Sequence, residues 1–141
     1  MNDALTIDAS VFVNAFSPTE AGSEKSWRFL TAIFKAGLPV YVPTLMLVEV
    51  VASLARKQNN TEMALNWMRE IQEVRHIVFI NLDTLLAQEA ADLAARHRLR
   101  GSDAVYVAVA RRFGATLVTL DIEQRERAAA IVPVRWPENI E

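Results

Sequence analysis

Apolar and polar positions follow two different patterns along the chain. Five short apolar runs have the length of buried strands and cover residues 4–7, 39–42, 77–80, 115–120 and 131–134. Longer stretches with the length or period of helices lie between them and cover residues 23–36, 44–58, 61–75, 83–98, 102–113 and 122–130. Continuous apolar strands that alternate with helices predict an α/β fold of three layers, in which helices flank both faces of a mainly parallel sheet.

Small and polar residues mark several of the predicted helix ends. Ser23 and Asp83 stand where N-terminal caps are expected, and Gly37 and Gly114 stand where helices end. The chain contains no internal repeat and no linker rich in Gly, Ser or Pro, and its 141 residues fit the size of one domain. We therefore expect a single domain over residues 1–141.

Composition excludes several classes of protein. Hydrophobic residues make up 52% of the chain and the net charge is −2, which excludes intrinsic disorder. The absence of cysteine excludes disulfides and thiolate metal sites. No apolar run approaches the roughly 20 residues of a membrane span, and Asp3, Ser10 and Asn14 do not fit a signal peptide. These features predict a soluble, cytoplasmic protein without membrane contact.

Acidic residues stand where the predicted fold collects functional groups. Asp8 and Asp121 directly follow apolar runs, and the carboxyl ends of parallel strands meet at one edge of a sheet. Asp103 begins a predicted helix, and Glu49 lies within the apolar stretch of residues 45–52. Four carboxylates without His or Cys suit a hard cation such as Mg²⁺ or Mn²⁺. A cation would also keep neighbouring carboxylates ionised.

These motifs follow one another in the order of a known family. Ile-Asp-Ala-Ser-Val at residues 7–11, the mid-helix Glu49, Ser-Asp-Ala-Val-Tyr-Val-Ala-Val-Ala at 102–110 and Leu-Val-Thr-Leu-Asp at 117–121 resemble the pattern of PIN-domain ribonucleases. The resemblance covers residues 5–134 and is strongest to the VapC-type toxins of toxin–antitoxin pairs. It implies the same α/β/α fold. It also implies that Asp8, Glu49, Asp103 and Asp121 form the catalytic, metal-binding cluster, supported by the hydroxyl groups of Ser10 and Thr119.

The resemblance implies an activity and partners as well. The expected reaction is endonucleolytic cleavage of single-stranded RNA or RNA loops, which depends on one or two Mg²⁺ or Mn²⁺ ions. The expected partners are the RNA substrate, a VapB-type antitoxin and a second copy of the chain. Four large apolar residues could serve such partners or be absorbed by the core: Trp27, Phe34, Met46 and Trp67.

Arginine dominates the basic residues, with twelve Arg and three Lys. Arginine presents a planar fork suited to phosphate, so a nucleic-acid partner is compatible with the net negative charge. Among the arginines, Arg96, Arg98 and Arg100 are the favoured candidates for RNA contact, because this run leads directly to Asp103. The roles of Glu123 and Trp136 stay open: Glu123 could add an acid to the site or face solvent.

Each acid also has a purely structural interpretation. Asp8 could cap the segment after the first strand. Asp121 and Gln124 fit a capping box, and Asp103 lies in a first helical turn, where the helix dipole favours a carboxylate in any protein. Glu49 shares a helix face with Ser53 and Arg56, as in a solvated polar stripe. The ordered set of four favours the metal site over four separate coincidences.

Two alternative functions follow from the same fold. A non-catalytic interaction module would keep the architecture without the activity, and a stand-alone PIN nuclease would act without an antitoxin. A phosphotransfer protein with Asp at strand ends is disfavoured, because the three lysines lie far from those ends in the sequence and Ser10 stands where a second Asp would be required.

Overall fold

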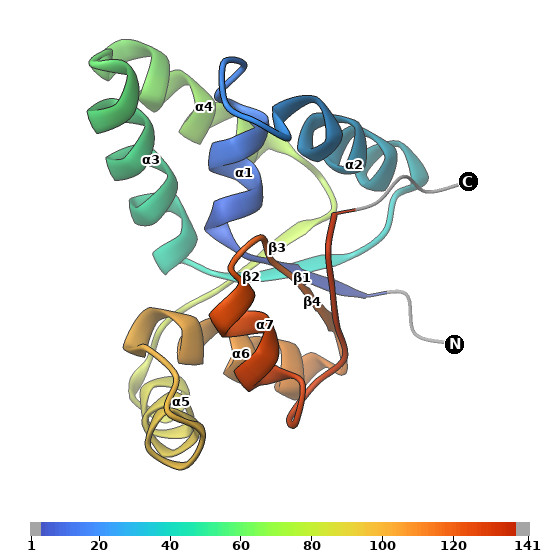
Figure 1. Cartoon of the computed structure of the whole chain (residues 1–141), viewed down its shortest axis with the longest axis vertical. Helices are drawn as coiled ribbons and strands as arrows, with labels where there is room; N and C mark the ends of the chain where they lie inside the picture. The colour runs from blue at the N-terminus through green and yellow to red at the C-terminus, as the bar shows by residue number, and fades with distance from the viewer. Residues whose placement is uncertain (1–3, 138–141) are drawn as a thin grey trace.

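The computed structural model describes residues 4–137, in which the chain forms five strands and seven helices (Figure 1). In chain order these elements are β1 (Leu5–Ile7), α1 (Ala9–Ala15), α2 (Ser23–Ala36), β2 (Val40–Pro43), α3 (Leu45–Gln58), α4 (Thr61–Glu73), β3 (Ile77–Ile80), α5 (Thr84–His97), α6 (Gly101–Phe113), β4 (Thr116–Val118), α7 (Ile122–Ala128) and β5 (Val134–Arg135).

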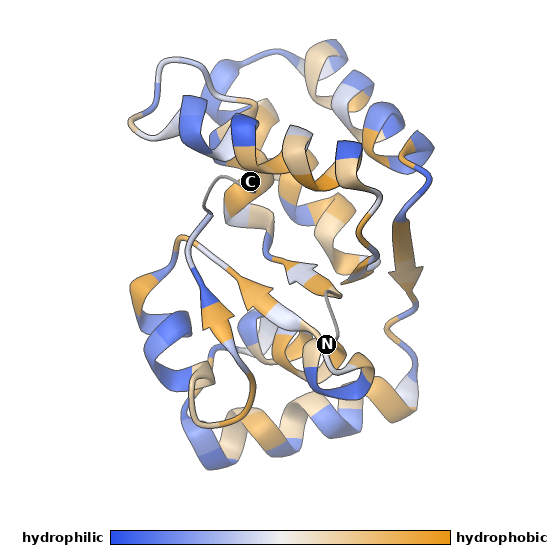
Figure 2. Ribbon diagram, turned by 90° about the vertical axis from the view of Figure 1, so that its right-hand side faces the viewer, coloured by the Kyte–Doolittle hydropathy of each residue, from blue (hydrophilic) through white to orange (hydrophobic). Residues whose placement is uncertain are grey.

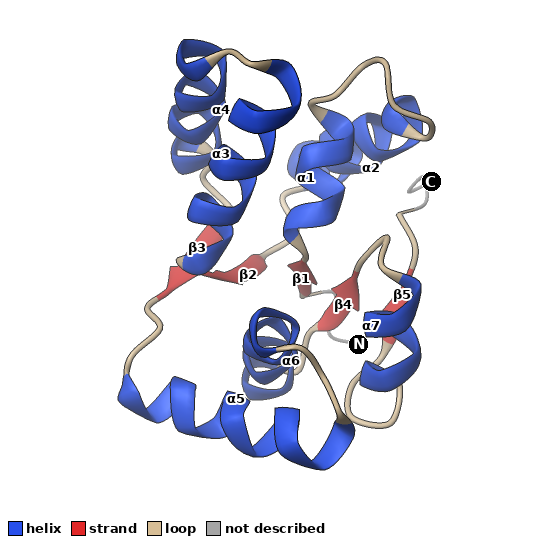
Figure 3. Ribbon diagram, turned by 60° about the vertical axis from the view of Figure 1, so that its left-hand side comes forward, coloured by secondary structure: helices blue, strands red, loops and turns tan. Residues whose placement is uncertain are grey.

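The five strands form one sheet in the order β3-β2-β1-β4-β5, and every neighbouring pair is parallel. Helices α1 to α4 lie on one side of this sheet and α5 to α7 on the other (Figure 3). The prediction of a parallel sheet flanked by helices on both faces is therefore confirmed.

The strand order places a change of direction between β1 and β4. From β1 the chain moves outward to β2 and β3, and it then returns to place β4 on the opposite side of β1. Within this pair Ile7 lies beside Val118. Such a switch point opens a crevice at the carboxyl ends of the strands, because the connections that leave the two strands diverge. The residues that follow β1 and β4 face this crevice.

The hydrophobic core lies on both faces of the sheet. Val40, Val42 and Leu117 are completely buried, and residues 104–110 of α6 are all buried between the sheet and α5. A helix that is apolar on all sides needs such a central position, because it has no face for water. Hydrophilic residues gather on the outer sides of the peripheral helices (Figure 2). No helix within residues 4–137 is long and apolar enough to span a membrane.

The structure corrects the sequence interpretation at four main places. The strand predicted over residues 115–120 is β4 at Thr116–Val118, because the Leu120 N–H donates to the Ser10 hydroxyl and not to a neighbouring strand. Helix α1 was not predicted, because six of its seven residues are buried and it lacks the polar face that marks an amphipathic helix. Ser23 does not cap α2: the N-cap is Gly22, and the Ser23 hydroxyl instead donates to the Ala15 carbonyl. The last strand begins at Val134, because Ile131 belongs to the turn after α7.

Other helix ends agree with their sequence signals. Gly37 and Gly114 adopt the left-handed conformation with φ of 71° and 61° and end α2 and α6. The Asp83 side chain accepts a hydrogen bond from the Leu86 N–H and caps α5. Each of these signals is local, so the sequence alone was sufficient to predict it.

Candidate active site

The crevice beside β1 and β4 contains a pocket of about 540 Å³ that we call the acidic pocket. Its carboxylates come from five different parts of the chain, and its cations come from α3 and from the start of α6. The charged residues that line it are Asp8, Glu20, Glu49, Asp103, Asp121, Arg56, Lys57 and Arg100. All four acids predicted from the sequence therefore line one pocket.

Asp8 lies at the base of the acidic pocket and begins α1. Its Oδ2 atom accepts a hydrogen bond of 3.0 Å from the Ser10 backbone N–H, and its side chain serves as the N-cap. Burial raises the pKa of Asp8 above its usual value, and the negative charge of Asp121 acts in the same direction, while the hydrogen bonds from Ser10 oppose the rise. Asp8 is therefore a carboxylate whose ionised form is costly in the absence of a nearby cation.

Asp121 begins α7 on the opposite side of the switch point. Its Oδ1 accepts a hydrogen bond of 3.0 Å from the Gln124 N–H, as the capping interpretation predicted. The Gln124 side chain does not complete the capping box, because its Oε1 accepts a hydrogen bond of 2.6 Å from the Thr119 hydroxyl. Capping engages Oδ1 of Asp121, whereas Oδ2 faces the guanidinium of Arg100 at 3.3 Å.

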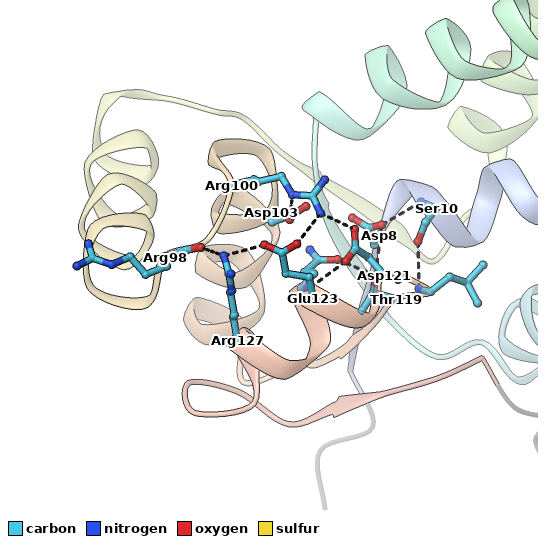
Figure 4. A network of polar contacts seen from close by, with 11 residues as sticks. Asp8, Ser10, Arg98, Arg100, Asp103, Thr119, Asp121, Glu123 and Arg127 are labelled. Atoms are coloured by element: carbon cyan, nitrogen blue, oxygen red, sulfur yellow. Dashed lines mark hydrogen bonds and ion pairs between the residues drawn. The ribbon is translucent and has the colours of Figure 1, made fainter.

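Two hydroxyl residues connect the ends of β1 and β4, as Figure 4 shows. The Ser10 Oγ accepts a hydrogen bond of 3.2 Å from the Leu120 N–H, and the Thr119 Oγ1 accepts one of 3.1 Å from the Asp121 N–H. Thr119 is completely buried, and its Oγ1 lies 3.5 Å from Asp8 Oδ2. Ser10 and Thr119 therefore fix the loop that presents Asp121 beside Asp8.

Asp103 enters the acidic pocket from the first turn of α6. Burial is the main cause that raises the pKa of Asp103 to about 6. The negative charges of Asp8, Asp121 and, to the smallest extent, Glu49 raise it further, while the positive charge of Arg100 lowers it. The electrostatic interactions of this one group thus connect all four predicted acids. The helix dipole favours a carboxylate in this position, but it does not offset the surrounding negative charge.

Glu49 reaches the acidic pocket from the middle of α3 and is only partly buried. The buried Tyr106 hydroxyl donates a hydrogen bond of 2.7 Å to Glu49 Oε1. Burial raises the pKa of Glu49, Tyr106 opposes the rise, and the charge of Asp8 adds to it. Ser53 and Arg56 line the pocket from the same helix, so the polar stripe predicted on α3 faces the pocket.

The carboxylates share the acidic pocket without converging on one point. Among residues 4–137, no three His, Asp or Glu side chains lie close enough together to hold one metal ion. Like charges in a partly buried site repel one another, which disfavours a closer approach of the ionised groups. The donor set nonetheless fits Mg²⁺ or Mn²⁺, because it offers only oxygen atoms and carries an excess of negative charge that a divalent cation would neutralise.

The three candidate arginines separate in the structure. Arg100 lines the acidic pocket. Arg96 forms an ion pair of 2.8 Å with Asp92 along α5, and Arg98 ends that helix in a left-handed conformation. Neither Arg96 nor Arg98 lines the pocket. The position of Arg100 is set by the start of α6, where it serves as the N-cap residue.

The structure also answers two questions that the sequence left open. Glu123 is exposed and lies between Arg100 and Arg127, with an ion pair of 2.7 Å to Arg127 (Figure 4). Trp136 packs beneath the guanidinium of Arg125, whose carbon lies 4.2 Å from the ring centre. Glu123 thus joins the edge of the acidic site, whereas Trp136 packs on α7.

Sequence reasoning missed three residues in or beside the pocket: Glu20, Lys57 and Tyr106. Tyr106 was assigned only to an apolar helix, although it follows Asp103 by three residues and therefore shares its helix face. Lys57 was placed away from the strand ends, but it lines the acidic pocket and forms an ion pair of 2.6 Å with Glu20. The spacing on α6 could have indicated Tyr106, whereas no local signal indicated Lys57.

A second feature lies at the C-terminal end of α1 and on α2 and α4, away from the four acids. Phe16 and Trp67 stack with ring centres 3.9 Å apart, and Trp27 meets both rings edge-on. Trp27 remains 44% exposed, Phe34 and Trp67 are half-buried, and Met46 is completely buried. Met46 is therefore a core residue and cannot contribute to a partner surface, contrary to one of the two possibilities left open by the sequence.

Comparison with known proteins defines the class. A family model described as the PIN domain matches residues 5–130, so the chain belongs to the PIN-domain family. A search of curated proteins found no match.

Solved structures with the same fold include VapC toxins. VapC20 from Mycobacterium tuberculosis, a sarcin-ricin loop cleaving toxin, has 20% identity and a TM-score of 0.74 over 93% of this chain and 98% of that one. DNA-bound VapBC from Salmonella typhimurium has 13% identity and a TM-score of 0.71 over 96% and 98% of the two chains. VapBC2 from Rickettsia felis, bound to a promoter DNA fragment, has 14% identity and a TM-score of 0.69 over 94% and 98%.

Proposed function

We propose that this protein is a metal-dependent endoribonuclease and the toxin of a VapBC-type toxin–antitoxin pair. The observation that carries the proposal is the meeting of Asp8, Glu49, Asp103 and Asp121 in one pocket at the switch point of a PIN-family fold. The similarity to VapC20, a sarcin-ricin loop cleaving toxin, supports RNA as the substrate class.

Bound Mg²⁺ or Mn²⁺, as one or two ions, would lower the pKa of a water molecule and neutralise charge on the phosphate under attack. The chain supplies the ligands and their orientation. Ser10 orients Asp8, the Gln124 N–H orients Asp121, and Tyr106 holds one oxygen of Glu49. Each of these donors is fixed by a helix, so the carboxylates have defined orientations, and an ion would draw them closer together.

Substrate binding requires positive charge around this negative pocket. Arg56, Lys57 and Arg100 line it from α3 and from the start of α6. Their place makes them the favoured contacts for the RNA backbone. Arg96 and Arg98 remain candidates only for a longer substrate that extends over the end of α5. Single-stranded or loop RNA fits this arrangement, since unpaired bases can splay apart and let the backbone enter the pocket.

The proposed partners are an antitoxin of the VapB type and a second copy of the chain, in the cytoplasm. The VapBC structures with the same fold support an antitoxin. The partly exposed aromatic rings of Phe34, Trp27 and Trp67 support a protein partner, because large apolar side chains at the surface favour burial in an interface. Light scattering of the purified chain at micromolar concentration tests the dimer, and a monomer would contradict it.

RNA cleavage by the purified protein tests the enzymatic proposal. A labelled single-stranded RNA is incubated with Mg²⁺, Mn²⁺ or EDTA and with wild type, Asp8→Asn or Asp103→Asn protein. We expect metal-dependent cleavage that falls by about a thousandfold or more in both variants, because each loses a charged ligand while keeping its shape. The matched control is Asp92→Asn, which removes a carboxylate paired with Arg96 on the outer face of α5 and should cleave like wild type.

Two outcomes would contradict the enzymatic proposal. Cleavage that survives both pocket substitutions would indicate a contaminating nuclease. Absence of cleavage on RNAs that include a structured loop, together with absence of Mn²⁺ binding by calorimetry, would favour a non-catalytic interaction module. The toxin assignment has its own test, because metal-dependent cleavage by a protein with no antitoxin gene nearby would favour a stand-alone nuclease.

A further inference from the structure

Arg100 holds an unusual place among the pocket cations. Its guanidinium lies 3.3 Å from Asp121 Oδ2, 3.4 Å from Glu123 Oε2 and, through Nε, 3.7 Å from Asp103 Oδ2 (Figure 4). One side chain thus contacts two of the four acids proposed as metal ligands and a third carboxylate beside them. Lys57, by comparison, pairs with Glu20 at the edge of the pocket.

These contacts do not secure the fold in the way that a buried ion pair does. The Arg100 side chain is 60% exposed, and ion pairs of exposed side chains are individually weak because water competes for both partners. The Asp121 carboxylate already has a structural role through Oδ1, which accepts from the Gln124 N–H. The Oδ2 atom that faces Arg100 is therefore available to any cation that enters the pocket.

We propose that Arg100 is a resident cation of the acidic pocket, which neutralises Asp103 and Asp121 in the metal-free protein and competes with a divalent ion for their oxygen atoms. The proposal rests on the metal site described above. Two cations that share the same carboxylates repel each other, so occupation by one weakens the other. Metal affinity is consequently lower than the carboxylates alone would give.

Glu123 gives the guanidinium another partner when Asp103 and Asp121 bind a metal ion. It lies in the first turn of α7, two residues after Asp121, and is not one of the four acids proposed as ligands. Glu123 Oε1 binds Arg127 at 2.7 Å, while Oε2 faces Arg100. The guanidinium can therefore leave the metal ligands and still keep a carboxylate partner.

Mn²⁺ binding to the metal-free protein tests this inference without relying on cleavage. Free Mn²⁺ is measured by electron paramagnetic resonance at pH 8 during titration of wild type, Arg100→Gln, Arg100→Lys and Arg127→Gln. We expect Arg100→Gln to bind Mn²⁺ about three- to tenfold more tightly, since a nearby positive charge is lost. Arg100→Lys keeps the charge and should bind with nearly the wild-type affinity.

Arg127→Gln is the matched control, because it removes one positive charge from the same network. Among the described residues, Arg127 forms an ion pair with Glu123 only. Its affinity should stay within about twofold of wild type. Equal affinity of wild type and Arg100→Gln, or weaker binding by Arg100→Gln, would overturn the role of Arg100 while leaving the metal site in place. Absence of Mn²⁺ binding by wild type would overturn the metal site itself, and the inference with it.

Discussion

The carboxylates of the acidic pocket and those on the outer helix faces have different surroundings. Asp92 and Glu24 lie on exposed helix surfaces, and each pairs with an arginine one turn further along its helix. Asp8 and Asp103 lie in a crevice where burial and like charges raise their pKa values. The outer carboxylates are paired within the folded chain, whereas the carboxylates that line the pocket outnumber the cations that line it. This difference supports the proposal that the pocket is the functional region.

The largest stability effect is expected from Asp103→Asn. The pKa of Asp103 is raised from 3.8 to about 6, so its ionised form is less favourable in the folded chain than in the unfolded chain. Removal of this charge should stabilise the metal-free protein by about 2 kcal/mol at pH 8. Urea unfolding in EDTA measures the change, and a loss of stability would contradict the assignment.

The same shift predicts a dependence on pH. The pKa of Asp103 is higher in the folded chain than in the unfolded chain, so the protonated carboxyl group favours the folded chain. This stabilisation is fully present below about pH 4 and is lost as the pH rises through about 6. The difference in unfolding free energy between Asp103→Asn and wild type should therefore grow over this interval. A difference that stays constant from about pH 4 to about pH 7 would show that Asp103 does not carry the shift.

A smaller effect is expected from Tyr106→Phe. This substitution removes the donor of the 2.7 Å hydrogen bond to Glu49 and should cost about 1 kcal/mol of stability. We also expect cleavage to fall by about tenfold, because Glu49 loses its fixed orientation. Tyr41→Phe is the control, since the Tyr41 ring stacks on Phe113 away from the pocket lining. Equal cleavage by both variants would remove Tyr106 from the site.

The smallest effect is expected on the outer faces. Asp92→Asn breaks an exposed pair with Arg96 and should change the unfolding free energy by less than about 0.5 kcal/mol. Thermal unfolding in low and high salt checks this value. A change as large as that of Asp103→Asn would remove the distinction between the two sets of carboxylates.

Local signals were sufficient for most of the fold, whereas the grouping of all four acids was implied by the family resemblance. Continuous apolar runs marked the strands, and the residues that follow β1 and β4 could be placed at one edge by the rule for parallel sheets. Helix α1 was not predicted, because its buried residues leave no polar stripe. The contacts of Tyr106 and Lys57 were not predicted either. Tyr106 lies 57 residues from its partner Glu49, and Lys57 lies 37 residues from its partner Glu20. Such contacts are created by folding. A short window of sequence could indicate only that Tyr106 shares a helix face with Asp103, and it held no signal for Lys57.

The most direct test of the central claim is the position of a bound ion. Crystals of the protein soaked in Mn²⁺ are measured at the manganese absorption edge, and an anomalous difference map locates the metal. We predict a peak in the acidic pocket, within about 2.3 Å of carboxylate oxygens from Asp8 and at least one of Glu49, Asp103 and Asp121. A fully soaked crystal with an empty pocket, or with Mn²⁺ only at exposed carboxylates such as Asp92, would contradict the account.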